Sequence, residues 1–420
     1  MALALERLQS AIANSAAMRR VRRLQPTGGR GDKIFPPTYP GEGARKPPPR
    51  HVFERRRIEG NNVLCVLIDS VQSQANRLEE ALRVARDEGA IGFPAITVDF
   101  SDTKVKDLGR ITTLDAPHRI FDAIIRDSEL DGVRFRETEQ GRRLIEAKAQ
   151  QARAVYELSP TALVFGAWNS TGEGGGLGAK FPRCVVSEVV GVGVATEPGV
   201  ERTTGEVAEI PSGRRVGSRI DPLGIRSGVA VYKLPNGGWS LEAPKDKKGK
   251  DAPKEVRPSE INHSNIAPSI SQLGVSIDYA VHSFVLSFAA LRRLRFGASA
   301  SDLAAQTALA ALALAAVTAQ DRNGYFLRSR CDLVPEANSA SGFEIIDSNG
   351  GVETFEINSG DANRLLADAA EAAKAAGLGW NDQDLILKPQ SKLVQLVVAS
   401  RELALAGKGE DESGDENNDA

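Results

Sequence analysis

Polar side chains crowd the turn between a predicted strand and a predicted helix at residues 68–82, IDSVQSQANRLEEAL. The turn carries Asp69, Ser70, Gln72, Ser73, Gln74, Asn76 and Arg77. One of the two serines suffices to cap the helix, and a helix N-terminus attracts anionic oxygens through its dipole and free N–H groups. We therefore predict that the phosphate and sugar groups of a polynucleotide are held by Gln72, Ser73, Asn76 and Arg77. The structural alternative for Arg77 is a salt bridge to Glu80 or to a distant acid.

A glycine-rich stretch, TGEGGGLGAKFPR at residues 171–183, follows an apolar run and raises the question of phosphate binding. A Walker loop needs Gly-Lys-Ser/Thr, and the order Gly-Ala-Lys-Phe at 178–181 departs from it. The spacing G-x-G-x-x-A is present, but Pro182 interrupts the helix that a dinucleotide site requires. We predict instead a loop whose backbone N–H groups approach a phosphodiester chain; a loop without a ligand is the alternative. The predicted contacts are Gly174, Gly175, Gly176, Lys180 and Arg183.

Three further segments combine basic, amide or aromatic side chains. They are the basic connection SGRRVGSR at 212–219, the polar loop EINHSNIAPSI at 260–270, and the Pro/Gly-rich segment 26–50. The last is either a linker or an arm that orders on a polyanion, since spaced bases and aromatics suit phosphates and stacked bases. The loop at 260–270 is expected to contact either a ligand or a neighbouring subunit. The predicted nucleic-acid contacts in the three segments are Arg214, Arg215, Arg219, His263, Asn265, Lys33, Phe35 and Tyr39.

Residue spacing gives little support to catalytic or metal chemistry. The chain has four histidines, and the i, i+4 pair of His118 and Asp122 lacks a third ligand at a recognisable spacing. Ser264 follows His263 directly, but neighbours in sequence do not make a catalytic triad. Three cysteines far apart and outside any CxxC spacing fit a reducing compartment without disulfides or a zinc site. We predict no catalytic residue, metal or cofactor.

Composition and charge place the chain among soluble globular proteins. Of 420 residues, 41% are hydrophobic and 26% charged, with a formal net charge of −2. The charge is unevenly distributed, because residues 1–60 hold 13 Lys/Arg against 5 Asp/Glu, whereas residues 409–420 hold six acids and no base. The most apolar run, 303–317, is too short and too alanine-rich to span a bilayer. We expect a cytoplasmic protein with no membrane partner.

Hydrophobic periodicity predicts the elements that position these residues. A short helix opens the chain, where Leu5, Leu8 and Ile12 fall at helical spacing. Strands are predicted at 62–71, 95–100, 160–168 and 184–195, and helices at about 73–88, 118–135, 278–296 and 301–319, with late strand or helix pieces in ETFEI and LVQLVVAS. In the helix at 73–88 the pair Glu79–Arg83 is expected on the outer face. The irregular alternation predicts an α+β fold with an added helical layer.

Several long motifs occur in a fixed order. They are LIDSVQSQANRLEEAL, HRIFDAIIRDSELDG, PTALVFGAWNSTGEGGGLGAKFPR, SRIDPLGI and NHSNIAPSI…GVSIDYAVHSF. Together, from about residue 30 to residue 405, they closely resemble the repeated backbone subunit of type I CRISPR interference (Cascade) complexes, in the type I-G lineage formerly called I-U. The resemblance implies an RRM-like (ferredoxin-like) palm of the RAMP superfamily with inserted finger and thumb elements. It implies no catalytic activity for this subunit.

The same resemblance implies the partners. Several copies polymerise along one CRISPR RNA, the guide pairs with target DNA, and other Cascade subunits and a recruited helicase-nuclease complete the system. A subunit that accepts any guide sequence should grip phosphate and sugar and leave the base edges free. One alternative is a subunit that cleaves bound target RNA with a metal, using Asp69 or Asp102. A less favoured one is a nucleotide-binding enzyme that uses the glycine-rich loop.

The expected domain organisation has three parts. Residues 1–61 form a basic N-terminal helix and a Pro/Gly-rich arm. Residues 62–405 form the palm with its insertions, including a charged mobile loop at 243–258. Residues 406–420 form an acidic tail, which we expect to be disordered because six of its last twelve residues are acidic.

Overall fold

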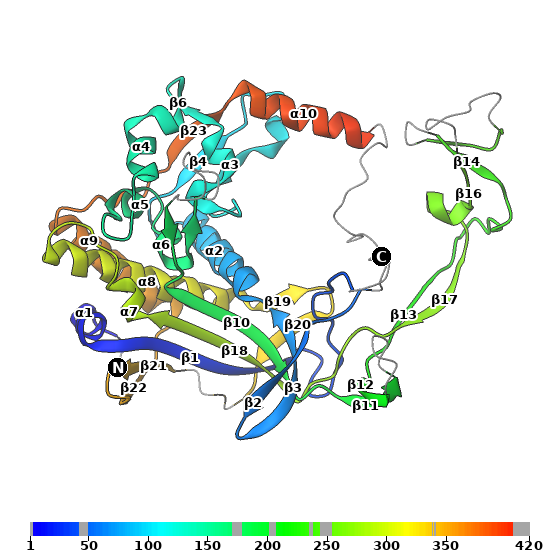
Figure 1. The fold of residues 1–420 in the computed structure, drawn as a ribbon, viewed down its shortest axis with the longest axis horizontal. Coiled ribbons are helices and arrows are strands. Elements are labelled where there is room, and N and C mark those ends of the chain that lie inside the picture. Colours follow the sequence, from blue (N-terminus) through cyan, green and yellow to red (C-terminus); the bar gives the residue numbers. More distant parts are fainter. Residues whose placement is uncertain are drawn as a thin grey trace. The chain divides into compact units, whose positions relative to one another are not determined.

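The computed structural model describes residues 3–41, 49–169, 179–200, 207–234, 238–243, 254–337, 339 and 342–405 (Figure 1). The chain divides into two compact units. Unit 1 comprises Met1–Pro37, Val52–Val194 and Ser276–Leu393, and unit 2 comprises Thr38–His51, Ala195–Val275 and Val394–Ala420. Helices are mixed with mainly antiparallel sheets, which confirms the predicted α+β class.

The main sheet of unit 1 is antiparallel and runs in the order β19-β20-β1-β18-β10-β3-β2. Its strands are β19 (Tyr325–Arg328), β20 (Cys331–Pro335), β1 (Ser15–Pro26), β18 (Tyr279–Ser287), β10 (Val185–Val192), β3 (Asn61–Asp69) and β2 (Phe53–Ile58). Two more strands, β21 (Phe343–Asp347) and β22 (Val352–Phe355), extend it, since β21 also pairs with β1.

The connections of this sheet are those of an RRM-like palm. Along the chain come β1, helix α2 (Val71–Asp87), β10, β18, helix α8 (Ser299–Asn323) and β20. In the sheet the four strands lie in the order β20-β1-β18-β10, each antiparallel to its neighbour. A βαββαβ chain with the last strand beside the first is the ferredoxin-like arrangement. The hairpin β2–β3 extends it at the β10 edge.

Helices cover one face of this sheet. Helix α2 packs on β10 and helix α8 on β18, while α9 (Ser359–Ala375) and α1 (Leu5–Asn14) pack against α8 (Figure 1). Alternate residues of β18, including His282, Phe284 and Leu286, are buried beneath the helices. By length and composition α8 could cross a membrane, but 94% of its apolar window is buried inside the protein. Its apolar surface is therefore already covered by protein.

The segment between α2 and β10 forms a second part of unit 1. It contributes strands to a small sheet of order β5-β4-β23-β6-β7, in which only β23 and β4 are parallel. Those strands are β5 (Arg110–Thr112), β4 (Ile96–Asp99), β23 (Leu385–Pro389), β6 (Ser128–Leu130) and β7 (Val133–Arg134). The short elements α3 (Ala123–Arg126), α4 (Glu139–Ile145), α5 (Arg153–Leu158), α6 (Thr161–Phe165), β8 (Ala167–Trp168) and β9 (Lys180–Phe181) follow, and α7 (Phe288–Leu291) and α10 (Ser391–Leu405) lie later in the chain.

Unit 2 consists mainly of the insertion between β10 and β18. It contains the pairs β11 (Thr196–Val200) with β12 (Val207–Pro211) and β13 (Arg215–Arg219) with β17 (Ile266–Ser271), and a sheet of β15 (Trp239–Ser240), β14 (Val231–Lys233) and β16 (Lys254–Val256). Val216 and Ile270 face each other across β13 and β17 and are 67% and 74% exposed.

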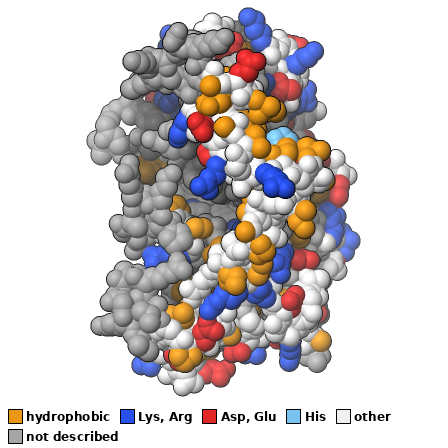
Figure 2. Space-filling view, turned by 90° about the vertical axis from the view of Figure 1, so that its right-hand side faces the viewer, with side chains coloured by type: hydrophobic (Ala, Val, Ile, Leu, Met, Phe, Trp, Pro, Cys, Tyr) orange, Lys and Arg blue, Asp and Glu red, His pale blue; other side chains and the backbone are white. Residues whose placement is uncertain are grey.

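Figure 2 shows hydrophobic and basic side chains next to one another on a face of the molecule.

Several predicted elements differ from those observed. Residues 278–296, expected as a helix, form the central strand β18 and the short helix α7. The strand expected at 160–168 is mostly helix α6, and the helix expected at 118–135 is only the short α3 between a 3₁₀ turn and β6. Residues 15–26, expected to belong to the separate N-terminal region 1–61, form β1 in the middle of the palm. Most of the charged loop at 243–258, residues 244–253, and the tail 406–420 lie outside the described residues.

Candidate nucleic-acid-binding site

The polar turn at the start of α2 is organised around a buried carboxylate. Asp69 is fully buried, and its oxygens accept hydrogen bonds from Ser73 Oγ at 2.6 Å, Gln74 Nε2 at 2.7 Å and Arg77 Nε at 3.0 Å. Ser70 is the N-cap, and its hydroxyl accepts from the backbone N–H of Ser73 at 3.2 Å. Five of the seven polar side chains in the turn therefore hold the turn itself.

Arg77 forms a salt bridge and a backbone hydrogen bond, as expected if its role is structural and not phosphate binding. Besides the ion pair with Asp69, its Nη2 donates to the carbonyl oxygen of Leu327 at 2.5 Å. Its side chain is only 23% exposed. Gln72 and Asn76 are exposed on the same helix and stay predicted contacts. These contacts favour a structural role for Arg77 over phosphate binding.

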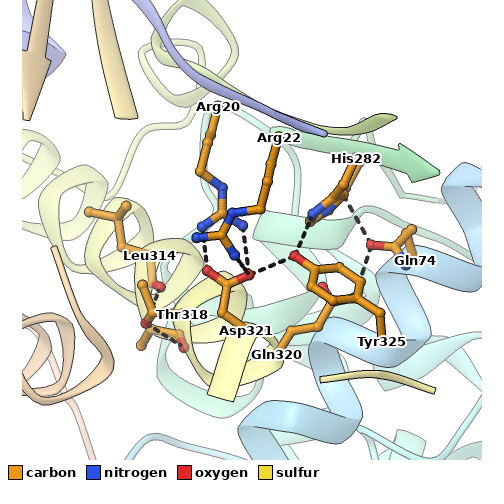
Figure 3. A network of polar contacts seen from close by, with 11 residues as sticks. Arg20, Arg22, Gln74, His282, Leu314, Thr318, Gln320, Asp321 and Tyr325 are labelled. Atoms are coloured by element: carbon orange, nitrogen blue, oxygen red, sulfur yellow. Dashed lines mark hydrogen bonds and ion pairs between the residues drawn. The ribbon is translucent and has the colours of Figure 1, made fainter. Parts of the chain in front are cut away.

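A buried polar network continues from Gln74 into the palm (Figure 3). Gln74 Oε1 accepts from Ser187 Oγ and from Gln320 Nε2, both at 3.2 Å. Ser187 Oγ lies 2.8 Å from His282 Nε2, and His282 Nδ1 lies 2.9 Å from the hydroxyl of Tyr325. Burial lowers the pKa of His282 to about 3, so the imidazole is neutral at physiological pH.

The far end of this network is an ion cluster. The Tyr325 hydroxyl donates to Asp321 Oδ1 at 2.7 Å, and the Asp321 carboxylate pairs with Arg20 and Arg22. Arg20 is 1% exposed and comes from β1, whereas Asp321 comes from α8 (Figure 3). The network therefore ties the palm strands to both covering helices. Because its members are buried among one another, we assign it a structural role.

A second buried pair joins α2 to the segment before the glycine-rich loop. Arg119 donates to both oxygens of Glu79 at 2.7 Å and to the carbonyl oxygen of Gly166 at 2.9 Å. The Glu79 and Arg119 side chains are 2% and 7% exposed. Burial raises the pKa of Glu79 to about 7, while Arg119 acts to lower it. The prediction that Glu79 lies on the outer face beside Arg83 is therefore wrong.

The glycine-rich loop is closed by the two-stranded hairpin β8–β9. Trp168 faces Lys180 across the hairpin, and Ala167 faces Phe181. Phe181 is buried and stacks on Phe121 with ring centroids 6.5 Å apart. Trp168 is 50% exposed, and Lys180 Nζ lies 5.5 Å from its ring centroid. The predicted loop residues Gly174, Gly175 and Gly176 lie outside the described residues.

Lys180, on β9, and Arg183, two residues after the end of β9, are exposed cations. Within the part of the chain that the structure describes, neither has an acidic side chain at salt-bridge distance. Partial burial and the charge of Arg119 lower the pKa of Arg183, while the charge of Glu79 acts to raise it. Sequence reasoning missed Trp168, although an aromatic residue directly before a glycine-rich loop with two bases was a usable signal. Together, Trp168, Lys180 and Arg183 offer a half-exposed aromatic ring and two exposed cations.

Three predicted residues of unit 2, Arg219, His263 and Asn265, come together at one loop cluster. Arg219 donates to the carbonyl oxygens of His263 and Ser264 at 2.9–3.2 Å. Asp221 accepts from the Ser264 N–H at 2.5 Å, which with the Leu223 N–H lowers the pKa of Asp221. Asn265 Oδ1 accepts from the Asp221 N–H at 2.7 Å. The motifs SRIDPLGI and NHSNIAPSI thus contact each other, and these contacts shape the loop.

Two more predicted arginines precede this cluster. Arg214 pairs with Glu197 and donates to the carbonyl oxygen of Gly213 at 3.0 Å. Arg215 is half-buried on β13 opposite Ser271. Arg214 is therefore engaged within unit 2, while RNA contacts at either residue stay predictions.

The Pro/Gly-rich segment is more ordered than an unstructured arm. Ile34 is 2% exposed, and the Phe35 N–H donates to the Arg330 carbonyl oxygen at 3.0 Å. The Phe35 ring lies 4.3 Å from the Arg330 guanidinium and 5.4 Å from Lys33 Nζ. In unit 2, Tyr39 exchanges backbone hydrogen bonds with Arg50 and is 38% exposed. Residues 42–48 lie outside the described residues.

The residues considered for other chemistry lie apart. Among the described residues, no group of three or more His, Cys, Asp or Glu side chains could hold a metal ion. Asp122 caps α3 and accepts from the backbone N–H of His118 at 3.0 Å. Cys65, Cys184 and Cys331 are free and buried. Asp102 is exposed, 3.9 Å from Lys388.

The fold is α+β with a ferredoxin-like strand order in its main sheet, and the β8–β9 pair places Trp168 opposite Lys180. Residues 18–196 match a family model described as CRISPR-associated protein GSU0053 (Cas_GSU0053). The matched span includes most of β1, and all of β3, α2, the hairpin and β10. The match supports a CRISPR-associated family and a role in a CRISPR system. A search of curated proteins gave no match.

Proposed function

We propose that the chain is a non-catalytic, CRISPR-RNA-binding subunit of a type I-G interference complex. Copies of it associate head to tail along one CRISPR RNA in the cytoplasm and present the guide for pairing with target DNA. The observation that carries the proposal is the RRM-like palm whose first half matches a CRISPR-associated family model. Other subunits and a helicase-nuclease would supply target cleavage.

The geometry of the exposed groups supports sequence-independent binding. Gln72 and Asn76 are exposed amides on α2, and Lys180 and Arg183 are exposed cations on β9 and just after it. The two elements are joined through Glu79, Arg119 and Gly166. Amides and cations bind phosphate and sugar, which every guide sequence provides. A binding site of this kind leaves base edges free for pairing.

The buried state of Asp69 argues against the RNA-cleaving alternative at that residue. A carboxylate that holds a catalytic metal must reach the scissile phosphate. Asp69 is fully buried, and its two oxygens accept from Ser73, Gln74 and Arg77. Asp102 is exposed, so a variant of Asp102 is the one to use in a test for RNA cleavage.

Purification of the full chain with a CRISPR RNA transcript tests the proposal. We expect copurified RNA of uniform length and a particle mass corresponding to several copies per RNA, since one palm covers few nucleotides. A strictly one-to-one particle on a full-length guide would contradict the assembly. Magnesium-dependent cleavage of complementary RNA that is lost in Asp102→Asn would instead support the nuclease alternative.

A further inference from the structure

The three tryptophans of the chain have different environments. Trp380 is 6% exposed and donates its indole N–H to the Gly92 carbonyl oxygen at 3.0 Å. Trp239, in unit 2, is 50% exposed and lies edge-on to His263 at 6.3 Å. Trp168 is also 50% exposed, and the charged group beside its ring is Lys180. Among the described residues, Trp168 is the tryptophan that is both half-exposed and accompanied by a cation over its ring.

The hairpin that carries Trp168 is firmly anchored. On one side Phe181 is buried against Phe121, and the backbone N–H of Asn169 donates to the Ala179 carbonyl oxygen at 2.9 Å. On the other side the buried Arg119 holds the Gly166 carbonyl oxygen. An aromatic ring on an anchored hairpin loses little conformational freedom when a ligand stacks on it.

Gly166 adds to this anchoring. Its φ of +84° is one that side chains rarely adopt, and a Cβ there would lie 2.9 Å from Arg183 Cγ and 3.1 Å from the Phe181 carbonyl oxygen. The backbone can therefore approach β9 this closely only at a glycine. The close approach places Arg183 directly beside the start of the hairpin.

We propose that Trp168, Lys180 and Arg183 form a stacking platform for one unpaired base of a single-stranded nucleic acid. The indole face stacks on the base, and the two cations contact the phosphates that flank it. This inference rests on the proposed function and deepens it, because it assigns one nucleotide of the bound strand to a specific protein surface. Every base has a π-face, so the platform accepts any sequence. Trp is the best partner of the aromatic residues for a stacked or cationic ligand.

Tryptophan fluorescence of the full chain tests the platform. In a Trp239→Phe background the exposed emitter is Trp168, and in a Trp168→Phe background it is Trp239; Trp380 is buried in both. The probes are CRISPR RNA and twelve-nucleotide oligouridine and oligothymidine. We expect quenching in the Trp239→Phe protein and little in the Trp168→Phe protein.

Affinity and salt dependence give an independent measurement. We expect Trp168→Ala to weaken RNA binding by roughly 5- to 150-fold, similarly for all sequences, and Trp168→Phe to retain part of the affinity. Lys180→Gln should lower the slope of log affinity against log salt by about one phosphate contact. Trp239→Ala is the matched control with the same exposure, and it should leave affinity unchanged.

The possible failures are distinguishable. If wild-type protein binds CRISPR RNA and Trp168→Ala binds it equally well without loss of quenching, the platform is refuted and the proposed function stands. If Trp168→Ala changes the particle mass at full RNA affinity, Trp168 contacts a protein, which also refutes the platform. If wild-type protein binds neither CRISPR RNA nor the oligonucleotides, the proposed function fails and the platform fails with it.

Discussion

Replacement of Arg77 by alanine separates a structural arginine from an RNA-binding one. Arg77 Nε lies 3.0 Å from an oxygen of Asp69, whose side chain is fully buried. Breaking a buried ion pair from one side costs about 3–5 kcal/mol, because the remaining charge stays buried without its partner. Ser73 and Gln74 still donate to Asp69, and Arg77 itself is 23% exposed, so the cost should lie at or below the lower end of this range. We expect Arg77→Ala to destabilise the protein by about 2–3 kcal/mol.

For a chain of 420 residues, that loss corresponds to a fall in melting temperature of about 2–3 °C. Circular dichroism melting of the RNA-free protein measures it. Arg83→Ala is the matched control on the same helix: its i, i+4 pair with Asp87 is half-exposed, and its loss should cost less than about 1 kcal/mol. A double-mutant cycle with Asp69→Asn should give a coupling energy above about 1 kcal/mol, since both variants remove the same pair.

RNA binding measured well below the melting temperature completes the test. We expect Arg77→Ala to keep its affinity and its salt slope, whereas Asn76→Ala, on the exposed side of α2, should weaken binding without lowering stability. An Arg77→Ala protein that melts like the wild type and loses affinity equally for all guides would refute the structural reasoning. Arg77 would then be a phosphate contact, as first predicted from the sequence.

Three further predictions concern pH, the hairpin and the tail. Burial holds the pKa of His282 at about 3, against about 6.5 in the unfolded chain, so below pH 6.5 the unfolded chain binds a proton that the folded chain does not. The free energy of unfolding should therefore fall by about 2 kcal/mol between pH 7.5 and 5. In urea titrations, His282→Gln should not show this pH dependence. The same pH dependence in both proteins would assign the loss to other groups. Gly166→Ala should destabilise more than Gly89→Ala, because both have positive φ but only Gly166 has neighbours that a Cβ would meet, and equal melting temperatures would contradict this. Deletion of residues 409–420, six of which are acidic, should leave RNA affinity intact, and a large loss in filter binding would show that the tail takes part.

Much of the palm could be predicted from local sequence. The β3–α2 unit was found because an apolar, β-branched run is followed by a polar turn and then by a helical stripe. Strand β10 and helix α8 were found for similar reasons, since β10 is rich in valine and α8 in alanine and leucine. Ser70 as a possible cap is confirmed as well.

The secondary-structure predictions are wrong where burial in the folded protein obscures the hydrophobic periodicity of a segment. In β18 the residues Ala280, His282 and Phe284 point inward and alternate with partly exposed ones, a period of two that was interpreted as helical. In α6 all five residues from Thr161 to Phe165 are buried, so the segment shows no polar face and resembles a strand. The role of β1 was missed because its inward arginine, Arg20, pairs with Asp321 about 300 residues later, and this partner is not visible locally.

In the candidate site, too, the sequence predicts which types of residue are present but not the role of each residue. The sequence identified a cluster of polar groups at the start of α2, but it could not show that Asp69 would be buried and would engage Ser73, Gln74 and Arg77. A buried carboxylate needs hydrogen-bond donors. The nearest donors to Asp69 are the same side chains that could have bound a phosphate. The polar groups left for a ligand on α2 are those that point away from Asp69, namely Gln72 and Asn76. By the same reasoning Lys180 and Arg183 are stronger candidates than Arg214 or Arg219, because described partners within unit 2 already engage the latter two.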